Sequence, residues 1–196
     1  MLLAFAPLGP GARAADSASA FIVQLDAEAT ATMKDGSIST ADRVRRFGDI
    51  VGRDFDVPEI AQIVLGRYWD RASIAERADF TNVFQAYMIR VYSDNFADYG
   101  GDSFRVIDQT ASSDGTTTIV RTSITPSATG KTITLEWLVS KKPDGFKVYD
   151  LSVDGVSLVA AQQEEFASII GRTGGQIATL TKLMRSKLNQ METAGK

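Results

Sequence analysis

Apolar side chains recur every three or four residues through the first half of the chain, which is the spacing of amphipathic helices. The longest such run begins at Ser73, whose spacing to Glu76 is that of a capping box. The pattern predicts four helices: residues 18–33, a segment carrying Val44, Phe47 and Val51, a segment opened by Asp56 and Pro58, and a long helix that starts at Ser73 and ends before Gly100-Gly101.

Beyond that glycine pair the apolar positions alternate, which is the period of half-buried strands. Short connectors of turn-forming residues separate the strands, so an antiparallel meander is expected. On the third strand Ile133, Leu135 and Trp137 share one face, and that face needs a cover of helices. The predicted strands lie near 103–111, 116–126, 131–141 and 146–153, and two further helices follow, from about Ser157 to Gly171 and after Gly174-Gly175.

This order of elements predicts an α+β fold: a four-stranded antiparallel curved sheet with helices packed on one face. Such a sheet encloses either a solid core or an apolar cavity. Residues 16–196 are expected to form one domain. Residues 1–15 resemble the end of a signal peptide, with Ala12-Arg13-Ala14 as the cleavage site, so we expect an exported protein.

Composition narrows the chemistry that this chain can perform. Its 196 residues include no histidine and no cysteine. A Ser-His-Asp triad, a thiol nucleophile and a zinc-thiolate site are therefore impossible. The net charge of −3 argues against a nucleic-acid partner. We expect no catalytic residue, no metal and no cofactor.

The stretch VYDLSVDGVSLV, residues 148–159, carries polar side chains that resemble a catalytic cluster. We interpret Asp154-Gly155 as a turn and Ser157 as the N-cap of the next helix. Asp150 is expected to pair with a neighbouring arginine. The polar groups of this segment are therefore predicted to be structural, and its apolar residues are the better functional candidates.

The same segment is the sharpest part of a resemblance to one family. Further matching positions are residues 55–58 and 65–69, Phe80, Phe84, Tyr87, Tyr92, Phe96, Tyr99, Gly100, Phe166, Ile169, Ile170, Gly174 and Leu180. Over about residues 18–190 the chain resembles the MlaC family of periplasmic phospholipid-binding proteins, also called toluene-tolerance or auxiliary transport proteins, which includes a branch linked to hopanoid biosynthesis.

The resemblance implies a soluble periplasmic carrier and not an enzyme. Its cavity would hold phospholipid acyl chains. Its partners would be an outer-membrane lipoprotein complex and an inner-membrane ABC transporter with an MCE-domain component. The chain departs from the family pattern at Gln162 and Gln163, where Tyr-Arg is common. That change puts a head-group or partner role of the arginine in doubt, and the ligand could be a phospholipid or a hopanoid-related lipid.

A carrier of acyl chains needs a deep apolar cavity, because each buried CH₂ contributes about 0.8 kcal/mol. Arg67, Arg71 and Arg90 are expected to form a solvated face, and the alternative is that they meet a phosphate at the cavity mouth. The predicted lipid-binding residues come from the long helix, the sheet and the helix after Ser157: Phe84, Met88, Val91, Tyr92, Val120, Ile124, Leu135, Trp137, Val139, Val148 and Phe166.

Two other functions fit the same pattern of elements. One is an enzyme in a cone-shaped sheet, which would need a carboxylate without a partner deep inside. Tyr149 and Asp150 are not expected to form its catalytic pair, because adjacent strand residues alternate in direction. The other is an interaction module with a solid core, which would lack a cavity of roughly 300 Å³ or more.

Overall fold

The computed structural model of the chain describes residues 17–96, 103–126 and 129–194. The predicted signal-peptide remnant, residues 1–15, and the Gly100-Gly101 end of the long helix lie outside these ranges. The helices are α1 (Ala18–Lys34), α2 (Thr40–Asp54), α3 (Val57–Leu65), the 3₁₀ helix η1 (Gly66–Arg71), α4 (Ile74–Phe96), α5 (Leu158–Arg172) and α6 (Ile177–Ala194).

Side-chain caps set where two central helices begin. The Asp56 carboxylate accepts a hydrogen bond from the Glu59 N–H at 3.3 Å and so caps α3. Ser73 and Glu76 form the predicted capping box, in which each side chain accepts from the other residue's backbone N–H. Both predicted helix starts are confirmed. The short helix η1 between α3 and α4 was not predicted.

The strands form one antiparallel sheet in the order β1-β2-β3-β4-β5. Its strands are β1 (Ser103–Ala111), β2 (Thr117–Thr125), β3 (Ile133–Lys142), β4 (Gly145–Val153) and β5 (Val156–Ser157). The α+β prediction is confirmed, but the described sheet has five strands and not four. Asp154 and Gly155 both have positive φ, which makes a tight hairpin turn, so two residues pair back with β4 before α5 begins.

A β-bulge in β4 changes which side chains face the helices. Leu138 pairs with Asp150 but Val139 pairs with Val148, which leaves Tyr149 as the extra residue. In a regular strand Val148 would face away from Leu151. The bulge brings both to the helix-covered face, where they pack in one core cluster with Trp137. Strict alternation, which was our reason for separating Tyr149 from Asp150, therefore does not hold here.

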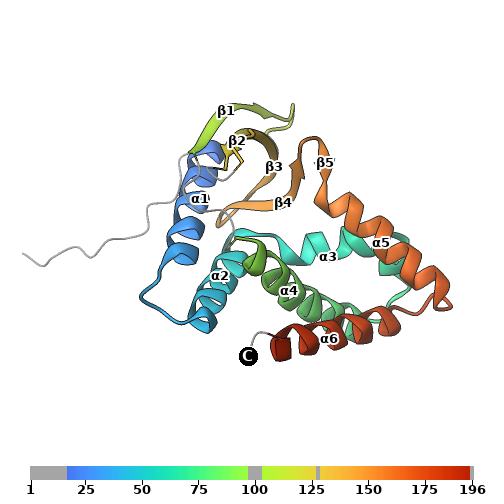
Figure 1. Cartoon of the computed structure of the whole chain (residues 1–196). Helices are drawn as coiled ribbons and strands as arrows, with labels where there is room; N and C mark the ends of the chain where they lie inside the picture. Colours follow the sequence, from blue (N-terminus) through green and yellow to red (C-terminus); the bar gives the residue numbers. More distant parts are fainter. Residues whose placement is uncertain (1–16, 97–102, 127–128, 195–196) are drawn as a thin grey trace, which may run out of the picture.

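Two clusters of buried side chains hold the fold together. The first joins α1 and α2 to the concave face of the sheet, and the second joins α3, α4, α5 and α6. Phe55 and Met88 pack against both. Figure 1 shows the curved sheet over the helices, with α1 beside β1 and α5 and α6 at the opposite end. The space where the two clusters meet is the natural place for a cavity.

Candidate functional site

A cavity of about 540 Å³ lies between the sheet and the helices. Its walls come from both core clusters: α1 and α2 on one side, α3, α4 and the start of α5 on another, and the concave face of β1 to β4 as a roof. Most of the lining side chains are aliphatic or aromatic. The volume exceeds the roughly 300 Å³ of a small ligand pocket, so the core is not solid.

Most of the predicted lipid-binding residues meet at this cavity. The lining includes Phe84, Met88, Val91, Tyr92, Ile124, Leu135, Trp137 and Val148. The other three do not line it: Val120 and Val139 are buried in the first core cluster and Phe166 in the second, where its ring packs edge-on against Phe80 and Phe84. Contact of the lining residues with lipid stays a prediction.

Sequence reasoning missed one whole wall. Leu25 and Ala29 on α1, and Phe47, Ile50 and Val51 on α2, also line the cavity. Their helical spacing marks an apolar face but gives no sign of what that face meets. Leu158 and Val159, from the segment that resembles the family most sharply, line it as well.

Asp150 holds the junction between β4 and α5. Its carboxylate accepts from the Leu151 N–H at 2.7 Å, the Val159 N–H at 3.2 Å and the Ser157 hydroxyl at 2.6 Å. The expected pairing with an arginine is therefore wrong. Ser157 in turn accepts from the Ala160 N–H at 2.9 Å, which confirms it as the N-cap of α5. Asp150 lines the cavity, but with these three donors it is not the carboxylate without a partner that a cone-shaped enzyme would need.

The α4 wall contributes two tyrosine hydroxyl groups to the cavity, those of Tyr87 and Tyr92. Burial raises the pKa of the Tyr92 hydroxyl, and Tyr87 and Asp150 nearby raise it further. The phenol therefore stays protonated at ordinary pH. The Tyr87 hydroxyl accepts a hydrogen bond from the Lys187 ammonium at 3.1 Å. This wall therefore presents aromatic rings and two hydroxyl groups to the cavity.

None of the three arginines considered for a phosphate lines the cavity. Arg67 donates to the Tyr68 hydroxyl and Arg90 to the Met191 carbonyl. The cation among the described lining residues is Lys34, in the last turn of α1. A lone lysine at a helix end carries no sequence signal of its own, so only the tertiary structure could find it.

A second hollow of about 640 Å³ is larger but shallow and open to solvent. Charged and amide side chains supply much of its wall, including Asp56, Glu59 and Lys142, whose ammonium lies 2.8 Å from Asp56 and 2.9 Å from Glu59. An acyl chain there would remain in contact with water. The buried cavity is therefore the candidate site.

The two glutamines that depart from the family pattern face different hollows. Gln162 lines the apolar cavity, whereas Gln163 lines the shallow one and donates to the Ile63 carbonyl at 2.6 Å. The first change alters the cavity wall, and the second bonds α5 to α3. Only Gln162 is therefore placed to touch a ligand in the cavity.

Within the described residues no helix is both long and apolar enough to cross a membrane, and no group of acidic side chains is arranged to hold a metal ion. The fold and cavity define the class: a small α+β protein whose sheet and helices enclose an apolar pocket.

The chain belongs to the MlaC protein family, whose profile matches residues 24–186. It is also similar in fold to a phospholipid-binding protein from Ralstonia solanacearum, solved in complex with a phospholipid. That match has a TM-score of 0.77 and 23% identity, and it covers 90% of this chain and 99% of the other.

Proposed function

We propose that the protein is a periplasmic lipid carrier that holds phospholipid acyl chains in the cavity between its sheet and helices. The observation that carries the proposal is the apolar cavity of about 540 Å³ at the seam of two core clusters. Family membership and the phospholipid bound by the Ralstonia protein support the same ligand class.

The energetics of the cavity suit a carrier. Burying about ten methylene groups would contribute about 8 kcal/mol relative to water, which corresponds to about micromolar affinity. A bilayer offers the same chains a similarly apolar environment. Exchange between membrane and cavity is therefore close to balanced, and a carrier loads and unloads without a chemical step of its own.

The proposed route joins two membranes. The carrier would exchange lipid with an outer-membrane lipoprotein complex and with an inner-membrane ABC transporter that has an MCE-domain component, and the transporter's ATPase would supply the energy. The support is the family to which the chain belongs.

The lipid cargo is tested by native mass spectrometry of protein purified gently from the periplasm, followed by lipid extraction. We expect one bound phospholipid mass, and delipidated protein should take up labelled phospholipid from vesicles. A bound hopanoid in place of a phospholipid would show that the cargo is a different lipid, but the protein would still be a lipid carrier. The proposal would be refuted if the purified protein contains no lipid and takes up none from vesicles.

The route is tested separately with inner-membrane vesicles that contain the transporter. Lipid-loaded protein should transfer its cargo to them faster than to protein-free vesicles of the same lipids. Equal rates would contradict the proposed partner and leave the lipid-binding proposal intact.

A further inference from the structure

The charged residues that line the cavity are unevenly placed. They are Asp26 and Lys34 on α1, and Asp150 at the start of the α5 junction. At the α5 end the charged lining residue is acidic, Asp150, and the amide of the lining residue Gln162 donates to the Glu165 carboxylate at 3.0 Å. An anionic phosphate would be repelled there. The α1 end carries the cation.

Asp26, Thr30 and Lys34 follow one another at intervals of four residues, so they form one stripe along α1. Leu25 and Ala29 form the adjoining apolar stripe, and both stripes line the cavity. Asp26 and Thr30 are half-buried and Lys34 is exposed. The polar stripe therefore lies where the cavity meets solvent, and it spans about 12 Å at 1.5 Å per residue.

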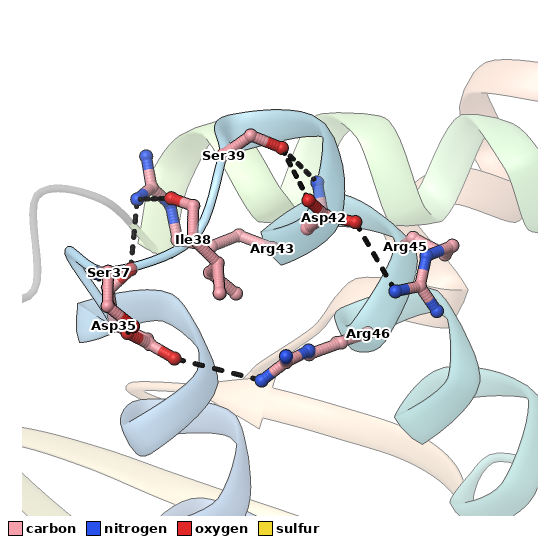
Figure 2. Close-up of polar contacts among 8 residues, drawn as sticks. All are labelled: Asp35, Ser37, Ile38, Ser39, Asp42, Arg43, Arg45 and Arg46. Carbon is pink, nitrogen blue, oxygen red and sulfur yellow. Dashed lines mark hydrogen bonds and ion pairs between the residues drawn. The ribbon is translucent and has the colours of Figure 1, made fainter.

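The arginines that follow Lys34 are occupied by the protein itself (Figure 2). Arg43 donates to the Asp35 and Ile38 carbonyls, Arg45 pairs with Asp42 at 3.3 Å, and Arg46 pairs with Asp35 at 3.7 Å. These contacts fix the corner between α1 and α2. By contrast, no carboxylate in the described part of the chain forms an ion pair with the Lys34 ammonium.

We propose that the mouth of the cavity at the α1–α2 corner binds the phosphate of a phospholipid head group through Lys34. Asp26, two turns earlier on the same stripe, favours a head group that also carries an amine cation. The inference rests on the proposed lipid-carrier function and adds a head-group class to it. The protein therefore prefers zwitterionic over anionic phospholipid, and either over a neutral lipid without phosphate.

The test is competitive loading. Delipidated full-length protein is mixed with vesicles of equal parts phosphatidylethanolamine, phosphatidylglycerol and diacylglycerol, and the bound lipid is quantified by mass spectrometry. We expect phosphatidylethanolamine to exceed phosphatidylglycerol about two- to fivefold, the range that an exposed ion pair supplies. Diacylglycerol should be the least abundant.

Three variants assign the preference to residues. Lys34→Glu should abolish the preference for phospholipid over diacylglycerol, and Asp26→Asn should abolish the preference for phosphatidylethanolamine over phosphatidylglycerol. Lys182→Glu makes the same charge change at an exposed position on α6 that does not line the cavity, and it should load like the unmodified protein. If Lys34→Glu unfolds at a lower temperature, Lys34→Met removes the charge and keeps the apolar stem.

The outcomes separate the two proposals. Failure of the unmodified protein to load any lipid refutes the carrier itself. Normal loading with the same lipid ratios in Lys34→Glu and Lys34→Met overturns the head-group site alone. A Gln162→Leu variant that alone loses the preference for phosphate would place the head group at the α5 end and would equally overturn the inference.

Discussion

Two buried alanines allow the empty space of the cavity to be tested directly. Ala29 on α1 is 4% exposed and lines the cavity, whereas Ala61 on α3 is fully buried in the second core cluster and does not line it. Replacing each by phenylalanine makes the same chemical change in two different surroundings. The pair therefore distinguishes a cavity from packed core.

The structure predicts opposite effects on stability. At Ala61 the ring has no room, and overpacking costs about 1–3 kcal/mol, which lowers Tm by about 2–12 °C at about 2–4 °C per kcal/mol. At Ala29 the ring enters the cavity, and its burial contributes about 1.5–3 kcal/mol against a helix-propensity cost of about 0.5 kcal/mol. Lipid-free Ala29→Phe should therefore be at least as stable as the unmodified protein.

Lipid binding should change in the other direction. A ring that displaces about four methylene groups removes about 3 kcal/mol of acyl-chain burial, which is about a hundredfold in affinity. The assays are thermal unfolding of delipidated protein, followed by circular dichroism, and lipid uptake from vesicles. If both variants lose the same stability, the cavity is not open in solution. If Ala29→Phe takes up lipid normally, the acyl chains lie elsewhere.

Three further changes test other parts of the structure. Trp137→Asp should lower the free energy of unfolding in urea by more than about 3 kcal/mol and abolish lipid uptake, since it removes a buried indole and places a charge in an apolar wall; a loss under about 1 kcal/mol would contradict this. Ser157→Ala should lower Tm by about 2–4 °C through loss of about 1 kcal/mol at the α5 cap, and an unchanged Tm would show the cap to be dispensable. Hydrogen bonds from Ser112 and Thr116 hold the pKa of Asp114 at about 2, so the stabilisation they give is present above about pH 4 and is lost as pH falls towards 2. In Asp114→Asn, Tm should therefore depend less on pH between about pH 4 and 2. An unchanged pH dependence of Tm would argue against these hydrogen bonds.

Local sequence signals predicted much of the fold. The alternation of Ile133, Leu135, Trp137 and Val139 placed β3 and its buried face, and Asp56, Ser73 and Ser157 marked helix starts that the structure confirms. These features depend on residues within a few positions of one another, so the chain reports them directly. The same locality explains why most of the predicted lining residues of α4 and the sheet were found.

What the sequence by itself determined, then, is the class of each segment and the side of it that avoids water. Only the tertiary structure decided that Val120, Val139 and Phe166 pack in solid core while Ala29 and Phe47 face open space. It also decided that the bulge at Tyr149 turns Val148 and Leu151 to one face. A core residue and a cavity residue have the same apolar pattern, because the pattern records exclusion from water. Whether such a side chain faces other protein atoms or an open cavity depends on the distance between elements that are far apart in the sequence.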